Sequence, residues 1–456
     1  MNKRQQHYSG GLAEVVDKPT LLTYSFLRDW FTTNGSLGLA MDILGLPWVE
    51  SDTPILELSD DEMMVNLKQE EASFYKQTIF RYREQLQIDD EPTLEFDKSK
   101  VFSILSILNT LRILWVQSIW LADPEATLKK AYEYANSIPK INTSMKSIKQ
   151  IDKFMKNEVW PRVIVVDMLS EFYFHVVYRD FGDKHPNVYS YINSQASDRD
   201  WMISSVTDME KVKDDEMSFD EYINLYGIRA DNDYELTEPR WYEIPKLINK
   251  RINSSNDQMR RKQTSKVSDG VGSNKLVLMA IEMQVLRSQV RKRALYNINQ
   301  LRKVLLNKSG GKKIPTNVSK EDYFHPERLV DLPKRKKRQS KTLVKKRQSK
   351  NSIKVFSGFG RSISSGSAVG SVVVVKKIDT KIPKDTIGIF PNASPTYAIL
   401  YPKCKGMIFL KGGITSHGAI VAREFGIPAI VDAKAKNIDS KKMVKIDGDT
   451  GEWEIV

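Results

Sequence analysis

A histidine follows a double glycine and a Thr-Ser pair near the carboxyl end of the sequence, in the string "KGGITSHGAIVAREFG". Five histidines occur in the 456 residues, and this one is His417. Glycine has no Cβ, so Gly412 and Gly413 permit a tight turn and a close approach of the backbone to a ligand. The hydroxyl of Thr415 or Ser416 can cap a helix that starts here. The spacing therefore places His417 in the first turn of a short helix.

The first turn of a helix is suited to phosphate chemistry. Its free N–H groups and positive potential attract anions, phosphate among them. The same potential disfavours an imidazolium ion, so it keeps His417 neutral and able to attack phosphorus. We therefore expect His417 to be a phosphoryl carrier, although an isolated histidine at a helix start is more often a cap or a surface residue. The expected phosphate-positioning residues are Lys411, Gly412, Gly413, Thr415 and Ser416.

The segment that carries this histidine has the pattern of a small α/β domain. Short β-branched runs such as "VVVV", "TIGIF" and "GMIF" are bounded by Gly, Pro and Asp, which is typical of strands. One helix interrupts them, from about Ser416 to Phe425, with Gly426 as its stop signal. We predict an α/β domain over residues 355–456.

Residues 1–308 have a mainly helical pattern, with apolar residues three and four positions apart. Loops are expected near residues 196–218 and 253–274, where Asp, Ser and Asn are frequent. One apolar stretch, residues 101–122, is long enough to span a bilayer. Because Asn109, Arg112 and Gln117 interrupt it, we interpret it as a buried core helix and expect no membrane span.

Residues 309–354 differ from both flanking regions, and we predict an exit segment followed by a flexible basic linker. Eleven Lys or Arg and no acid lie between Lys334 and Lys354, which leaves about +2 of the net charge of +13 for the rest of the chain. A run so poor in large apolar residues cannot bury enough surface to order itself. Binding of a polyanion such as nucleic acid is the alternative, but no aromatic residues are interleaved for base stacking.

The composition excludes several other classes of protein. The single cysteine, Cys404, rules out a disulfide framework and a multi-cysteine metal site. The first residues lack the apolar run of a signal peptide. We therefore expect a cytoplasmic, metal-free chain.

The string "GGITSHGAIVAREFGIPAIV" resembles the phosphohistidine motif in the swivelling domain of phosphoenolpyruvate-utilising enzymes. The flanks "FSGFGRSISSGSAVGSVVVV" and "VKIDGDTGEWEI" resemble the opening strand and the closing hairpin of that domain. Phe409 and Leu410 depart from the family, where Thr and a polar residue are common. The resemblance implies that His417 is phosphorylated and swings between two sites.

The string "YGIRADNDYELTEPRW" resembles a signature in the middle domain of rifampicin phosphotransferase-like and phenylphosphate synthase-like proteins. Ile228 stands where that family has a histidine. Four charged residues lie close together in this string: Arg229, Asp233, Glu235 and Arg240. Such a group is more often an ion-pair cluster that orders a loop, and the alternative is a substrate-facing wall.

The same resemblance implies a source and a destination for the phosphoryl group. We find no Gly-rich nucleotide loop, so we expect a separate ATP-grasp subunit that holds ATP and Mg²⁺ and phosphorylates His417. A small-molecule acceptor would then receive the group at the helical body. Three alternatives stay open: a phosphoenolpyruvate-dependent phosphocarrier, a relative that performs no chemistry, and a polyanion-binding protein.

Overall fold

The computed structural model describes most of the chain. The described residues are 7–8, 19–48, 54, 56–59, 62–66, 104–142, 145, 147–182, 184–185, 188–197, 199–253, 267, 269–311, 313–325, 357–378, 380–394, 397–412, 416–431, 433, 435, 438 and 442–456. The predicted basic linker, residues 334–354, lies outside them, and the predicted exit segment before it lies partly within them. Among the described residues, no helix is both long and apolar enough to cross a membrane.

The chain forms two compact units, each built from separate segments. The first unit comprises Met1–Ala13, Tyr24–Ser205 and Thr264–Val304, and the second comprises Glu14–Thr23, Val206–Gln263 and Leu305–Val456. The predicted boundaries at residues 308 and 354 follow the sequence alone, and they stay a prediction.

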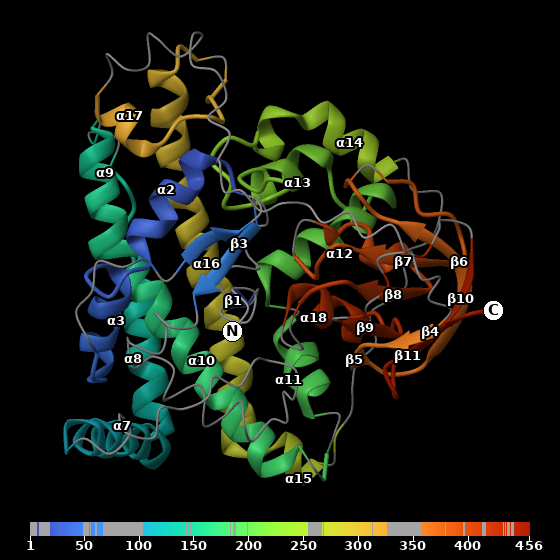
Figure 1. Cartoon of the computed structure of the whole chain (residues 1–456), viewed down its shortest axis with the longest axis horizontal. Coiled ribbons are helices and arrows are strands. Elements are labelled where there is room, and N and C mark those ends of the chain that lie inside the picture. Colours follow the sequence, from blue (N-terminus) through green and yellow to red (C-terminus); the bar gives the residue numbers. More distant parts are fainter. Residues whose placement is uncertain are drawn as a thin grey trace, which may run out of the picture. The chain divides into compact units, whose positions relative to one another are not determined.

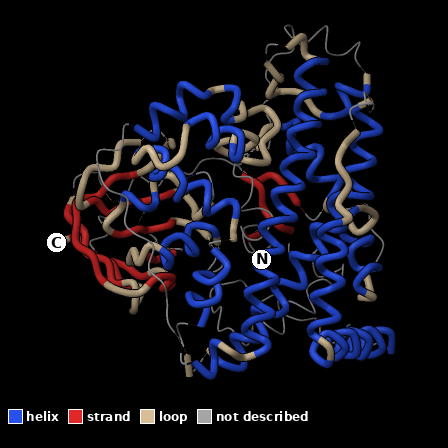
Figure 2. Tube along the Cα trace, turned by 180° about the vertical axis from the view of Figure 1, so that it is seen from behind, coloured by secondary structure: helices blue, strands red, loops and turns tan. Residues whose placement is uncertain are grey.

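Helices dominate the described residues before position 326 (Figures 1 and 2). They are α2 (Leu21–Trp30), α3 (Ser36–Leu44), α7 (Ile104–Ala122), α8 (Pro124–Asn136), α9 (Ile148–Phe154), a π-helical turn (Met155–Val159), α10 (Trp160–Phe181), α11 (Val188–Ser197), α12 (Trp201–Lys213), α13 (Phe219–Tyr226), a 3-10 turn (Trp241–Glu243), α14 (Pro245–Asn253), α15 (Asp269–Gly272), α16 (Lys275–Lys308) and α17 (Lys320–Phe324). The mainly helical character predicted for this part of the chain is confirmed.

Helix α16 is the long amphipathic helix that its apolar spacing indicates, and ion pairs attach it to α10. Arg287 contacts Asp167 at 3.1 Å and Glu171 at 3.3 Å. Next to these ion pairs in the sequence, each helix has a fully buried apolar residue: Val166 on α10 and Leu286 on α16. The charged side chains are only 15–35% exposed, so the ion pairs offset the desolvation of groups that are largely buried beside these apolar residues.

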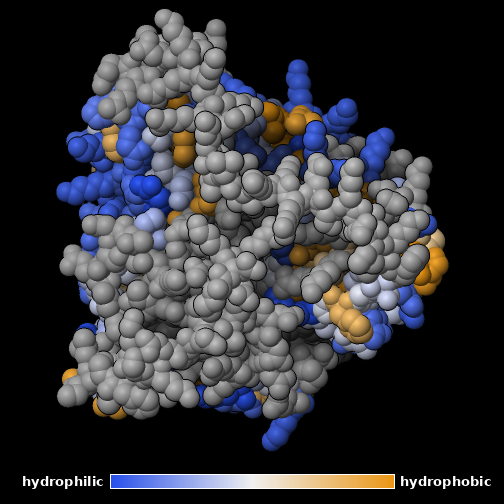
Figure 3. Space-filling view, viewed as in Figure 1, coloured by the Kyte–Doolittle hydropathy of each residue, from blue (hydrophilic) through white to orange (hydrophobic). Residues whose placement is uncertain are grey.

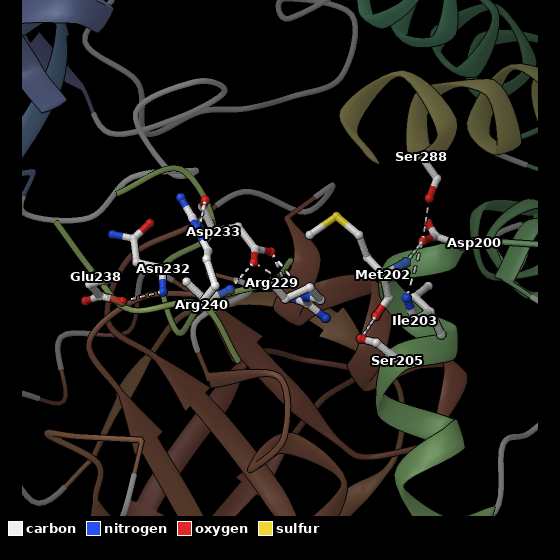
Figure 4. Close-up of polar contacts among 11 residues, drawn as sticks. Asp200, Met202, Ile203, Ser205, Arg229, Asn232, Asp233, Glu238, Arg240 and Ser288 are labelled. Carbon is white, nitrogen blue, oxygen red and sulfur yellow. Dashed lines mark hydrogen bonds and ion pairs between the residues drawn. The ribbon is translucent and has the colours of Figure 1, made fainter. Parts of the chain in front are cut away.

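Helix α12 lies where a loop was predicted, so that prediction is wrong. Asp200 caps the helix: its Oδ1 accepts hydrogen bonds from the backbone N–H of Met202 at 2.8 Å and of Ile203 at 3.3 Å (Figure 4). Ser288 of α16 donates to the same oxygen at 2.7 Å. The polar residues that suggested a loop include this cap and two buried residues of the helix itself, Ser205 and Asp208, which are hydrogen-bonded there.

A small three-stranded sheet in the first unit was not predicted either. Strand β3 (Glu62–Asn66) lies between β1 (His7–Tyr8) and β2 (Leu56–Ser59), antiparallel to both. These strands have two to five residues, which is too short for an alternating pattern to stand out in the sequence.

Residues 357–456, here called the C-terminal sheet region, contain an eight-stranded mixed sheet in the order β4-β11-β10-β6-β7-β8-β9-β5. The strands are β4 (Ser357–Phe359), β5 (Arg361–Ser364), β6 (Ser367–Val374), β7 (Thr386–Phe390), β8 (Gly406–Phe409), β9 (Ala429–Val431), β10 (Met443–Asp447) and β11 (Glu452–Ile455). Strands β6 to β9 are parallel neighbours, and the others pair antiparallel.

Burial follows this division of the sheet. Every residue of β7, β8 and β9 is buried, as expected for central parallel strands covered on both faces. On β10, buried and exposed residues alternate, which is typical of an antiparallel strand with one solvated face. The α/β pattern predicted for this region is confirmed, including the closing β10–β11 hairpin.

Candidate functional site

The helix predicted to carry the histidine is α18 (His417–Glu424). Its N-cap is Ser416, whose Oγ accepts a hydrogen bond from the backbone N–H of Ala419 at 3.4 Å. His417 is the first residue of the helix and so lies in its first turn, as predicted. Ser416, rather than Thr415, is the capping residue, and Gly426 follows the helix with φ +57°.

Two glycines let the backbone around His417 pack closely. Gly412 has φ +146°, and a Cβ there would lie 2.9 Å from Cβ of Ala393. A Cβ on Gly418 would lie 2.8 Å from the ring of Phe409 and 3.0 Å from Cα of Ala393. Both positions therefore require glycine for close packing of the protein itself, and the approach of a ligand at Gly412 stays a prediction.

Ala393 is hydrogen-bonded to both ends of the segment from Lys411 to Gly418, here called the histidine turn. Its backbone N–H donates to the carbonyl oxygen of Lys411 at 3.1 Å, and its own carbonyl accepts from the N–H of Gly418 at 2.8 Å. The loop that follows β7 therefore holds both the residue after β8 and the first turn of α18. Next to it, the hydroxyl of Ser394 is buried and has no hydrogen-bond partner among the described residues.

Arg361 is a residue of this turn that sequence reasoning missed. It lies on β5, and its Nη2 donates to the carbonyl oxygen of Gly412 at 3.0 Å. The guanidinium thus brings a positive charge to the turn that precedes His417. Fifty-one positions separate the two residues, so no local signal in the sequence connects them.

The described geometry covers part of the predicted phosphate site. Lys411 is half-buried, whereas Gly412 and Ser416 are buried. Gly413 and Thr415 lie outside the described residues, and the backbone alone is described at His417. In the described part of the chain, His, Cys, Asp and Glu side chains form no cluster suited to a metal ion.

The second predicted site is a buried cluster of charges in the second unit (Figure 4). Arg229 forms an ion pair with Asp233 at 3.0 Å, and each side chain is 3% exposed. Asp233 also accepts from the backbone N–H of Ala230 at 2.9 Å. The guanidinium of Arg229 lies 5.0 Å above the ring of Trp241, an arrangement that adds a cation–π attraction.

The other two charged residues of the cluster form hydrogen bonds: Arg240 with the backbone of the same loop, and Glu235 with threonines that include two near the amino terminus. Arg240 is fully buried and donates to the carbonyl oxygens of Asp233 at 2.5 Å and Glu235 at 3.4 Å. The carboxylate of Glu235 accepts from Thr20, Thr23 and Thr237, including both the N–H and the hydroxyl of Thr20 and Thr237. The structure therefore brings the four predicted residues together, with extensive internal pairing.

Glu238, at the edge of this cluster, was not singled out from the sequence. Its carboxylate accepts a hydrogen bond from the backbone N–H of Asn232 at 2.9 Å (Figure 4). Burial raises the pKa of Glu238 to about 7, and the negative charges of Asp231 and Glu235 act in the same direction. The carboxyl group thus changes its charge near neutral pH.

Comparison with known protein families finds a match for the segment that contains α18. Residues 382–451 match the family model described as "PEP-utilising enzyme, mobile domain". The segment that contains His417 is therefore similar to the mobile domain of PEP-utilising enzymes. The mobile-domain match runs from just before β7 to the β10–β11 hairpin, and so it contains Ala393, Gly412 and all of α18.

Curated relatives extend the similarity beyond the mobile domain. Rifampicin phosphotransferase of Bacillus cereus is 23% identical over 310 residues, which are 54% of this chain and 35% of that protein. An uncharacterized phosphotransferase of Bacillus subtilis, YvkC, is 31% identical over 22% of this chain and 12% of its own length. Pyruvate kinase of Staphylococcus aureus is 35% identical over 20% of this chain and 17% of its own length. The chain therefore spans about a third or less of each of these relatives.

Proposed function

We propose that this chain is a phosphotransferase component that carries a phosphoryl group on His417. The observation that supports it best is the mobile-domain match to residues 382–451, in which His417 is the first residue of α18. A helix amino terminus offers N–H donors and a positive potential to a phosphate. Arg361 and Lys411 supply two cations near the same turn.

In the proposed reaction, a lone pair on a neutral imidazole nitrogen of His417 forms a bond to phosphorus while the bond from phosphorus to the donor oxygen breaks. In the second transfer, the N–P bond breaks as an oxygen of the acceptor binds phosphorus, and the imidazole nitrogen regains its lone pair. The acceptor hydroxyl loses its proton to solvent or to a base. Positioning and charge stabilisation carry most of the catalysis in such transfers, and the start of α18 with its neighbouring cations is the proposed source of both.

We propose ATP as the donor, bound with Mg²⁺ by a separate ATP-grasp subunit, and a small molecule as the acceptor. The names of the two relatives called phosphotransferases support the reaction class. A swivelling mobile domain fits a carrier that visits two sites. Phosphoenolpyruvate is the alternative donor, and the experiment below distinguishes the two.

The test uses phosphoramidate first, because it can phosphorylate an accessible histidine without a partner protein. The expected result is an acid-labile, base-stable phosphate on the wild type and on His185→Ala, but none above background on His417→Ala. Labelled ATP with purified ATP-grasp proteins, and labelled phosphoenolpyruvate in a parallel reaction, then identify the donor. Equal labelling of His417→Ala and the wild type would disprove the carrier role.

A further inference from the structure

The hydroxyl group of Ser394 is buried in the C-terminal sheet region and has no hydrogen-bond partner in the part of the chain that the structure describes. The residue is 2% exposed. Apolar atoms at the surface of the same region, visible at the right edge of Figure 3 where Figure 1 places β6 and β10, are common in soluble proteins. A buried hydroxyl without a partner is rare, because it loses its hydrogen bonds to water and gains none in return.

The backbone of Ser394 is held on both sides. Its N–H donates to Oδ1 of Asn392 at 3.2 Å. Its carbonyl oxygen accepts from the hydroxyl of Tyr401 at 2.5 Å and from the N–H of Tyr397 at 3.4 Å. The main-chain polar groups of the residue are thus satisfied, and its side-chain hydroxyl is the group that can still bond a ligand. Because the backbone is fixed, this hydroxyl is a preorganised donor.

Ser394 lies next to the first turn of α18. The carbonyl group that joins Ala393 to Ser394 accepts the N–H of Gly418 at 2.8 Å, and Gly418 directly follows His417. Standard bond lengths keep the Ser394 hydroxyl within about 8 Å of that N–H. An imidazole ring with a phosphoryl group extends about as far from the backbone, so the hydroxyl and the phosphoryl group can meet.

We propose that Ser394 is a phosphate-positioning residue, whose hydroxyl donates a hydrogen bond to an oxygen of the phosphoryl group on His417. This inference rests on the proposed carrier role. Phosphoryl oxygens are negatively charged, and hydrogen bonds to such oxygens are shorter and stronger than those between neutral groups. The hydroxyl keeps its proton in this bond, so both transfer steps remain as written above. Phosphorylation supplies the partner that the buried hydroxyl lacks, which offsets the cost of burying it.

Thr386 provides a matched control. This residue is fully buried, and its hydroxyl too has no hydrogen-bond partner among the described residues. Thr386 is the first residue of β7, whereas Ser394 follows the last residue of that strand, so the two hydroxyls belong to opposite ends of β7. Burial is therefore common to both residues, and the hydrogen bond from the adjoining peptide to α18 distinguishes Ser394.

The test measures the rate at which phosphoramidate phosphorylates His417. Ser394→Ala should lower this rate roughly 10- to 100-fold, the effect of losing a hydrogen bond to a charged group. Thr386→Val should leave the rate unchanged. The phosphorus NMR resonance of the phosphohistidine should move in Ser394→Ala and stay in place in Thr386→Val, because the phosphoryl group loses a donor in the first variant alone.

Hydrogen exchange separates this role from a structural one. Because the hydroxyl bonds no described residue, Ser394→Ala should protect the backbone amides of β7 and β8 at least as well as the wild type does. Ser394→Ala phosphorylated at the wild-type rate would overturn the inference, as would a slow variant with less protected amides; in both cases label on His417 leaves the carrier role intact. Label that persists in His417→Ala, or a wild type that takes no label, would contradict the carrier role and the inference together.

Discussion

Arg361 donates a hydrogen bond from its Nη2 to the carbonyl oxygen of Gly412, five residues before His417. The arginine extends from β5 and the glycine follows β8, so the bond ties an edge strand to the turn in front of α18. Gly412 has φ +146°, a backbone conformation that a guanidinium contact can help to hold. Arg361 is therefore a positioning residue for the histidine turn.

Arg361→Ala should slow phosphorylation of His417 by phosphoramidate roughly tenfold, the effect of losing one hydrogen bond worth ~1.4 kcal/mol. Arg361→Lys should recover part of the rate, since an ammonium group can donate to the same carbonyl. Lys445→Ala is the matched control, because Lys445 lies on β10 and pairs with Glu454. Rates of Arg361→Ala and Lys445→Ala that do not differ would contradict the positioning role.

Gly418→Ala should destabilise the C-terminal sheet region by about 1–3 kcal/mol, because its methyl group would collide with Phe409 and Ala393. Hydrogen exchange of the backbone amides of β6 to β9 measures this effect. Adding Phe409→Leu should recover part of the loss, since it removes the ring that the methyl group meets. For comparison, Gly270→Ala should have little effect, because no atom lies within 4 Å of a Cβ at that position.

Arg229→Met should destabilise the second unit by roughly 3–5 kcal/mol, because it leaves the buried Asp233 carboxylate without its ion pair. Arg28→Met should cost less than about 1 kcal/mol, since Arg28 and its partner Asp29 are 46% and 33% exposed. Thermal unfolding distinguishes these outcomes. If Arg229→Met kept its stability and lost only acceptor binding, the cluster would be a substrate-facing wall and not an ion-pair cluster that orders the loop.

Stability should depend on pH through Glu238. Its pKa rises from 4.5 to about 7 on folding, so between these values the folded state binds more protons than the unfolded state. The free energy of unfolding should therefore fall as pH rises from about 4.5 to 7. Glu238→Gln should remove up to about 3 kcal/mol of this decline, whereas Glu216→Gln, at an exposed position, should leave it unchanged. Parallel pH profiles for the wild type and Glu238→Gln would show that this carboxyl group is not responsible.

The sequence by itself determined the local features of this protein. A hydroxyl cap at Thr415 or Ser416, His417 in the first turn of a helix and Gly426 after its end follow from preferences that act within one or two helical turns. The alternation of strands in residues 355–456 follows from the period of two that a pleated sheet imposes. The charged residues from Arg229 to Arg240 could be grouped because they are close neighbours along the chain.

Only the tertiary structure decided which distant residues meet. Sheet order places Arg361 beside Gly412, and the packing of α18 against β8 makes glycine obligatory at position 418. Burial, which depends on the whole fold, raises the pKa of Glu238 and leaves one face of α7 exposed. The composition of residues 101–122 indicated an apolar helix, but composition cannot specify which faces of a helix neighbouring elements cover, since that coverage arises from contacts distant in sequence.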